Sequence, residues 1–305
     1  MDTDPHLAEV LGCVQESSRG ALRSWVQDSR NSCIALLCRP SIPQDVVASS
    51  NAGSVAQSPA GGRVPAGGHS KLGGWPFVAA GTAWPVDKKG AQMVFIGQIN
   101  FAEIPNVLDS CPDKGILLLF KSIDYRDYLP KDRAGFRVMW FEDLEATAFD
   151  CRPPNVPSFS PLPEMPLDSR VVWSLPEPTS YGEVLGVDLS PEQERKIANW
   201  VRKYNEQEMG KHQLLGVNHA RLEEAKAVCA FAANGVSYSA QRHKDSMYKH
   251  LVDASQDWQL LWRITDDSTS GQGTAATELL VMIRSQDLND RKLQNAWMVG
   301  FPKAL

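Results

Sequence analysis

Three short apolar segments in the middle of the chain decide the fold: MVFIGQI at residues 93–99, GILLLF at 115–120 and FRVMWF at 136–141. Branched and aromatic side chains dominate them, which is typical of β-strands. Proline, glycine and aspartate separate the segments, as in Pro112-Asp113-Lys114-Gly115, and these residue types favour turns. Short strands joined by turns, with few helices between them, predict an α+β fold built on a mostly antiparallel or mixed sheet.

Helical patterns lie on both sides of these segments. Asp4-Pro5 is a helix-start signal, and apolar residues follow it at the spacing of an amphipathic helix through Val26. Ser190-Pro191-Glu192-Gln193 has the form of a capping box and predicts a second helix. The remaining expected elements are a strand at 33–38, a helix at about 241–254, and strands at 258–264, 279–283 and 296–301.

Two stretches of unusual composition predict how the chain is divided. In residues 48–68, 16 of 21 residues are Ala, Ser, Gly or Pro, so this stretch buries too little apolar surface to order itself and is expected to be a flexible insertion. Residues 152–178 contain eight prolines and are expected to form an extended, irregular connector, or alternatively a proline-rich ligand for an aromatic groove. The predicted organisation is an N-terminal helix and strand (1–47), the insertion (48–69), a first half-domain (70–151), the connector (152–189) and a second half-domain (190–305).

Composition excludes several classes of function. The chain has 305 residues, 43% of them hydrophobic, and a formal charge of −5. No apolar run is long enough to cross a membrane, and the acidic, polar start is unlike a secretory signal, so a cytoplasmic protein is expected. An acidic chain also lacks the clustered Lys and Arg that grip nucleic acid. Residues 71–191 account for the whole net negative charge, so a basic partner is expected to meet this part of the chain.

The cysteines and histidines predict no metal site and no cofactor. The six cysteines include no Cys-x-x-Cys pair, and the six histidines include no His-Glu-x-x-His, whereas zinc sites need ligands at such close spacings. His212 and His219 are seven residues apart, but Gly216 lies between them. The thiols of Cys33 and Cys38 are expected to pack as small apolar groups.

A run of short motifs links the chain to a known family. Residues 70–76 read SKLGGWP, residues 81–85 read GTAWP and residues 96–101 read IGQINF. This order resembles the opening of the YwqG-like family of bacterial proteins of unassigned function. HQLLG at 212–216 and DWQLL at 257–261 resemble later landmarks of that family. The resemblance implies an α+β fold with two similar halves around a common core.

The motif residues are expected to serve the structure. Gly73 and Gly74 suit a tight turn with positive φ before an extended Trp75-Pro76 step. The amides of Gln98 and Asn100 can satisfy backbone groups of a neighbouring loop. The indole rings can cover the edge of the sheet. The motif residues given this structural role are Gly73, Gly74, Trp75, Pro76, Trp84, Gln98, Asn100, His212 and Gln213.

The sequence predicts a protein that is not an enzyme. Folding can bring His212 beside Asp257, or His69 beside Lys71, but their spacing does not require either pair, and no Gly-x-Ser-x-Gly elbow is present. An enzyme or small-ligand-binding protein of unknown reaction stays open as an alternative. A scaffold whose exposed aromatic residues bind peptides is a third reading.

Proteins that resemble the YwqG-like family recur beside secreted bacterial toxins, which implies a role as immunity proteins. An immunity protein needs a rigid scaffold and a surface that complements its toxin. Because nuclease toxins carry basic clefts, an acidic patch with aromatic anchors is the expected chemistry, and the expected partner is a cognate toxin with a basic surface, from a contact-dependent or type VI secretion system. The candidate partner-binding residues are Asp124, Tyr125, Asp127, Tyr128, Glu142, Asp143 and Glu145.

Overall fold

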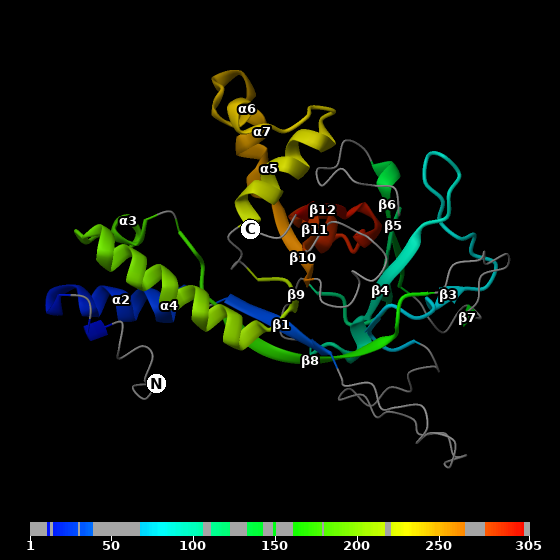
Figure 1. The fold of residues 1–305 in the computed structure, drawn as a ribbon, viewed down its shortest axis with the longest axis horizontal. Coiled ribbons are helices and arrows are strands. Elements are labelled where there is room, and N and C mark those ends of the chain that lie inside the picture. Colours follow the sequence, from blue (N-terminus) through cyan, green and yellow to red (C-terminus); the bar gives the residue numbers. More distant parts are fainter. Residues whose placement is uncertain are drawn as a thin grey trace, which may run out of the picture.

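The computed structural model shows a long antiparallel sheet with helices on its outer side (Figure 1). It describes residues 11–12, 15–29, 31–38, 68–105, 111–122, 133–142, 149–150, 161–178, 180–216, 221–265 and 278–301. The strands are β1 (Asn31–Cys38), β2 (Lys71–Leu72), β3 (Val78–Ala79), β4 (Val94–Asn100), β5 (Ile116–Lys121), β6 (Phe136–Phe141), β7 (Phe149–Asp150), β8 (Met165–Ser174), β9 (His212–Leu214), β10 (Trp258–Thr265), β11 (Glu278–Arg284) and β12 (Trp297–Phe301). The helices are α2 (Glu16–Asp28), α3 (Tyr181–Leu185), α4 (Pro191–Met209), α5 (Leu222–Ala233), α6 (Ala240–Lys244), α7 (Lys249–Ala254) and α8 (Ser285–Asn289).

Ten of these strands form one sheet in the order β12-β11-β10-β9-β1-β8-β2-β4-β5-β6. Its neighbouring strands all pair antiparallel, and β3 and β7 form a separate antiparallel pair. The predicted mixture of helices with a largely antiparallel sheet is therefore confirmed. The strands expected at 33–38, 93–99, 115–120 and 136–141 correspond to β1, β4, β5 and β6, and those expected in the C-terminal part correspond to β10, β11 and β12.

The sheet curls so that its two ends approach each other, and the main core fills the space inside. Residues from β1, β4, β5, β10, β11 and β12 contribute buried side chains to this core, and Trp262 is its largest fully buried member. Across the gap between the ends, the rings of Phe136 on β6 and Trp297 on β12 lie 6.0 Å apart. The molecule is thus organised around an almost closed sheet.

Helices cover the outer side in two groups (Figure 1). α2, α3 and α4 pack through Trp25, Tyr181 and Trp200 into a core of their own beside the β1–β8 pair. α5 packs on β10, β11 and β12, and α6 and α7 project beyond it. The predicted capping box of α4 is present, because Ser190 Oγ accepts from Gln193 N and Gln193 Oε1 accepts from Ser190 N. No helix of the described ranges is both long enough and apolar enough to span a bilayer.

The same local geometry, a bulge beside a pair of residues with positive φ, occurs twice in the sheet: once at β4 and once at β10. In β4 a bulge leaves Ile96 without a strand partner, and its carbonyl accepts a hydrogen bond from Gly73 N at 2.9 Å. In β10 a bulge leaves out Leu261, whose carbonyl accepts from Leu215 N at 3.1 Å. The two residues that follow the short strand β2, Gly73 and Gly74, have φ values of 61° and 67°. The two residues that follow the short strand β9, Leu215 and Gly216, have φ values of 57° and 95°.

Two of the sequence-based predictions need correction, and one helix was missed. The interpretation of residues 152–178 as an irregular connector is wrong for 165–174, which form β8, the longest strand, at the centre of the sheet. The only proline within β8 is Pro166, near its start beside the two-residue strand β2, and the β-favouring residues at 171–173 continue it. The single helix expected at 241–254 is divided into α6 and α7, because Asp245 has an extended conformation and caps the next turn through Met247 N. The Ala-rich helix α5 was not predicted.

Candidate functional site

The motif at residues 70–76 forms a turn that runs out of the short strand β2. A Cβ atom at Gly73 would overlap the carbonyl oxygen of Pro163, and one at Gly74 would overlap the side chain of Glu164. The left-handed conformation of both residues also disfavours any other side chain. These two glycines therefore let the turn pass directly against the segment that leads into β8.

The amides of Gln98 and Asn100 tie this turn to β4. Gln98 Oε1 accepts from Phe77 N at 2.9 Å, and Gln98 Nε2 donates to His69 O at 2.8 Å. Asn100 Nδ2 donates to Gly68 O at 2.9 Å. Both side chains are almost fully buried. Their hydrogen bonds therefore satisfy backbone groups that water does not reach. The two amides thus fix the backbone path of residues 68–77.

The indole rings lie on a face of the sheet, not at its edge. Trp84 makes an edge-to-face contact with Phe120 of β5 at 5.3 Å and donates through Nε1 to Met93 O at 2.8 Å. Trp75 contacts Trp84 at 6.5 Å. The expectation that these rings cover the sheet edge is corrected accordingly, because the chain between β2 and β4 folds over the outer face of β4 and β5.

A charged cluster lies beside the turn. Lys71 Nζ is 2.8 Å from Glu164 Oε2, and His69 Nε2 is 3.3 Å from Glu164 Oε1. The side chain of Lys71 is only 3% exposed, whereas that of Glu164 is 41% exposed. The contacts with His69 and Lys71 lower the pKa of Glu164 to about 2, against the opposing effect of its partial burial.

This cluster brings together His69 and Lys71, one of the two pairs considered from the sequence, through a carboxylate that the sequence did not indicate. A carboxylate with a pKa of about 2 is a weak general base at neutral pH. The ion pair of Lys71 with Glu164 instead joins β2 to the start of β8. Its chemistry fits a structural connection.

The cluster makes stability depend on pH. Because the folded pKa of Glu164 is about 2 and its reference value is 4.5, its contribution is complete above pH 4.5 and is lost as the pH falls toward 2. We therefore expect the difference in unfolding free energy between the wild type and Glu164→Gln to shrink across this window. Urea denaturation of both proteins at a series of pH values measures it, and a constant difference would contradict the role of the carboxylate charge.

The second pair considered from the sequence is not brought together. His212 lies on β9 opposite Leu36 and Ile264, so its side chain faces the core. Burial, followed by the charges of Arg263 and Lys211, lowers its pKa to about 4, which keeps it neutral. Asp257 precedes the opposite end of β10. Gln213 Nε2 donates to Leu215 O and so supports the turn after β9.

Of the acidic residues expected to meet a partner, the structure describes Glu142. It follows β6, its side chain is 48% exposed, and its Oε1 lies 3.3 Å from Arg291 Nη1. Asp113 lies 3.7 Å from the same guanidinium nitrogen. Glu142 is therefore in part neutralised within the chain. The other candidates, which are Asp124, Tyr125, Asp127, Tyr128, Asp143 and Glu145, lie outside the described residues.

Comparison with known protein families assigns the chain to one of them. The family described as a domain of unknown function, DUF1963, has a model that matches residues 70–299. The chain belongs to this family. The DUF1963 match begins at Ser70, just before β2, and ends within β12. It therefore leaves out β1, although β1 lies at the centre of the sheet. No curated protein matches the chain.

Sequence reasoning did not single out Glu164 or Trp173. Glu164 is 93 residues from Lys71, so only the fold reveals the pair. Trp173 lies on β8 and is 46% exposed. A signal for it was present, because a tryptophan in a Val-Val-Trp run suits a strand. The prolines on both sides of this run favoured an irregular connector, so the strand was not predicted.

Proposed function

We propose that this DUF1963 protein is a YwqG-like immunity protein of the cytoplasm, which binds and neutralises a secreted bacterial toxin of the nuclease class without catalysing a reaction. The observation that carries the proposal is the solvent-exposed tryptophan on the β1–β8 pair. Trp173 is 46% exposed and Val171, two residues before it, is 36% exposed. Tryptophan is enriched among the residues that dominate binding energy at protein interfaces.

The position of Trp173 suits an interface that needs little rearrangement. Trp173 pairs with Ser32 and Val171 pairs with Ile34 in the eight-residue ladder between β1 and β8. Directly opposed residues of an antiparallel pair point to the same side of the sheet, so both exposed side chains lie on one side of a rigid ladder. A fixed apolar pair loses little conformational entropy when a partner covers it.

The roles of the motif residues support a binding function over catalysis. Gln98 and Asn100 bond to backbone groups, and Lys71 is paired with Glu164. His212 faces the core in its neutral form. Gln98, Asn100 and Lys71 are thus engaged in holding the sheet together, whereas His212 is buried without a hydrogen-bond partner for its Nδ1 among the described residues.

We also infer that the chain contains two copies of one structural unit. The orders β2-β4-β5-β6 and β9-β10-β11-β12 run outward on the two sides of the β1–β8 pair. Both contain the bulge and the positive-φ pair described above. In chain order β1 belongs with the first unit and β8 with the second, yet β1 pairs with β9 and β8 pairs with β2. Each unit therefore lends a strand to the other.

The proposal predicts that Trp173→Ser weakens the complex with the toxin. Loss of a tryptophan anchor costs about 2 kcal/mol or more, which corresponds to an affinity about 30-fold lower. Val184→Ser is the matched control, because Val184 is 51% exposed on α3, away from the ladder. Isothermal titration calorimetry with the protein encoded by the neighbouring gene measures both variants.

Co-expression tests the function itself. Production of this chain should restore the growth of cells that express the neighbouring gene, and a stable complex should elute from size exclusion. Absence of both rescue and complex would overturn the proposed function. Rescue with an unchanged affinity of Trp173→Ser would keep the function and move the interface elsewhere.

A further inference from the structure

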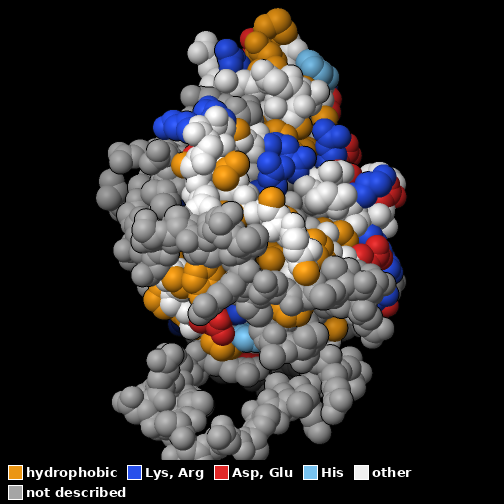
Figure 2. Space-filling model, turned by 90° about the vertical axis from the view of Figure 1, so that its right-hand side faces the viewer, with side chains coloured by type: hydrophobic (Ala, Val, Ile, Leu, Met, Phe, Trp, Pro, Cys, Tyr) orange, Lys and Arg blue, Asp and Glu red, His pale blue; other side chains and the backbone are white. Residues whose placement is uncertain are grey.

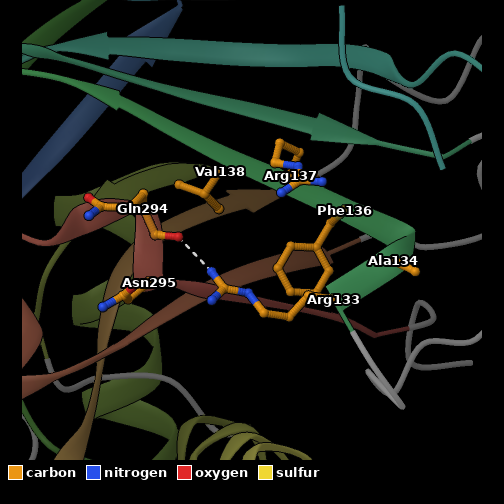
Figure 3. A pocket seen from close by; sticks show the side chains of 7 residues that line it. All are labelled: Arg133, Ala134, Phe136, Arg137, Val138, Gln294 and Asn295. Atoms are coloured by element: carbon orange, nitrogen blue, oxygen red, sulfur yellow. Dashed lines mark hydrogen bonds between the residues drawn. The ribbon is translucent and has the colours of Figure 1, made fainter. Parts of the chain in front are cut away.

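A cavity lies between the two ends of the sheet. β6 is the last strand at one end, and the short helical turn at 293–295 precedes β12, the last strand at the other end. The cavity between them has a volume of about 480 Å³, within the ~300–1,000 Å³ range of small-molecule pockets. Figure 3 shows Arg133 and Phe136 from the β6 side facing Gln294 from the turn. A ligand that fills this cavity would therefore touch both ends of the sheet.

The guanidinium of Arg133 is held in a fixed position at this cavity. Its Nη2 donates to Gln294 O at 2.5 Å and to Ala296 O at 3.1 Å. The same group lies over the ring of Trp297, 5.7 Å from the centre of the ring. Within the described chain its Nε and Nη1 make no hydrogen bond, so these two donors are available to a ligand. Because Arg133 is already ordered, it loses little conformational entropy when a ligand binds.

A second arginine, Arg137 of β6, lines the same cavity and is exposed. Among the described residues, no carboxylate lies within ion-pair distance of Arg133 or Arg137. Arg291, by contrast, lies 3.3 Å from Glu142 and 3.7 Å from Asp113, beyond the other end of β6. The fold thus neutralises Arg291 and leaves two arginines at the cavity without a carboxylate partner.

The positive charges of the two arginines act on each other. Partial burial, followed by the charge of Arg137, lowers the pKa of Arg133. The charge of Asp287 opposes these effects, but Asp287 Oδ1 accepts a hydrogen bond from Asn295 Nδ2 at 2.8 Å. Figure 2 shows the side of the molecule with β4 to β6, where Lys and Arg side chains gather beside hydrophobic ones. A bound anion would relieve the repulsion between the two guanidinium groups.

The size and lining of the cavity indicate the chemistry of its ligand. A guanidinium binds phosphate oxygens through paired, charge-assisted hydrogen bonds. Two guanidinium groups match the double charge of a phosphate monoester better than the single charge of a carboxylate. The volume of about 480 Å³ far exceeds the ~30 Å³ of a water molecule, so it has room for more than a phosphate group. Phe136 and Val138 are only 2% and 5% exposed. The lining therefore offers little apolar surface, and a polar organic part is expected.

We propose that the cavity binds a small phosphate monoester with a polar organic part, and that Arg133 and Arg137 hold its phosphate group. Arg133 supplies Nε and Nη1 from a fixed position, and Arg137 supplies the second positive charge. The turn at 293–295 forms the opposite wall. This site does not depend on the toxin proposed above.

Titration of the ¹⁵N-labelled full chain with ribose 5-phosphate tests the site. The Nε–H resonances of Arg133 and Arg137 should shift together and saturate, with a dissociation constant of about 1 mM or below. Ribose should cause no shift, because it lacks the charge. Inorganic phosphate should bind about threefold more weakly or worse, because it leaves most of the cavity unfilled. The absence of a saturable shift at these arginines would overturn the proposal, and an equal affinity for inorganic phosphate would overturn the organic part of the ligand.

Substitution of Arg137 tests which group binds the phosphate. Arg137→Gln should weaken the binding of ribose 5-phosphate about tenfold or more, because it removes a charge-assisted contact. Arg23→Gln is the matched control: it removes the same charge from an exposed position on α2, outside the cavity, and should leave the affinity unchanged. Equal weakening by both variants would show attraction by overall charge and overturn the site. Because Arg137 is exposed, its variant should unfold at the temperature of the wild type, which separates binding from stability.

Discussion

Valine in place of Gly97 will lower the free energy of unfolding by about 3 kcal/mol. It overpacks a position that lies directly against β2 and against Trp262 of β10. A Cβ atom there would lie 2.7 Å from Lys71 O, 2.8 Å from Leu72 Cδ2 and 3.0 Å from Trp262 Cη2. The first of these neighbours is backbone and cannot rotate away. Urea denaturation of the wild type and Gly97→Val measures the effect.

Two companion variants make this result specific. Gly20→Ala adds a Cβ atom to α2 where nothing lies within 4 Å, and it should stabilise the protein by up to about 1 kcal/mol through helix propensity. Trp262→Leu in the Gly97→Val background should not restore stability, because the clash with Lys71 O remains and the loss of the largest buried side chain leaves a cavity. A Gly97→Val protein as stable as the wild type would mean that the bulge in β4 yields easily.

Glu164→Ala will destabilise the protein by about 3 kcal/mol, more than Lys71→Met, which we expect to cost about 1 kcal/mol. The asymmetry follows from burial. Removing the carboxylate leaves the buried ammonium of Lys71 without its partner, whereas removing the ammonium leaves a carboxylate that is 41% exposed and still contacts His69. Thermal and urea unfolding of the two single variants measure the order.

The double variant completes the comparison. Glu164→Ala combined with Lys71→Met should be more stable than Glu164→Ala alone, because it no longer contains an unpaired buried charge. Equal costs for the two single variants, with additive effects in the double variant, would contradict the asymmetry. The contact of His69 with Glu164 is lost in both variants that lack Glu164, so it cancels in the coupling energy of the cycle, though not in the comparison of the two single variants.

The strands between 93 and 141 were predictable because each is rich in branched or aromatic apolar residues and is closed by turn residues. β2 and β9 are two and three residues long, too short for any periodicity, and they exist because longer strands lie beside them. β8 was hidden by flanking prolines. α5 is apolar around most of its surface, with eight buried residues, so it lacks the stripe that reveals an amphipathic helix.

The roles of the candidate-site residues also differ in how far the sequence predicts them. The structural roles of Gln98 and Asn100 follow from residue type, because an amide after an apolar strand can bond to a passing backbone. The partnership of Lys71 with Glu164 depends on the order of strands in the sheet. Local sequence carries no record of that order, since side chains far apart along the chain determine it.

The position of β1 between β8 and β9 restricts when the molecule can be completed during its synthesis. β1 ends at Cys38, but its two neighbours in the sheet are β8 and β9, made more than a hundred residues later. At ~5–20 residues per second, a translating ribosome takes several seconds to cover that distance. For that time the apolar residues Ile34, Ala35 and Leu36 lack their final partners. The nascent chain thus offers a folding chaperone a well-defined target, one that disappears only when β8 and β9 have been synthesised.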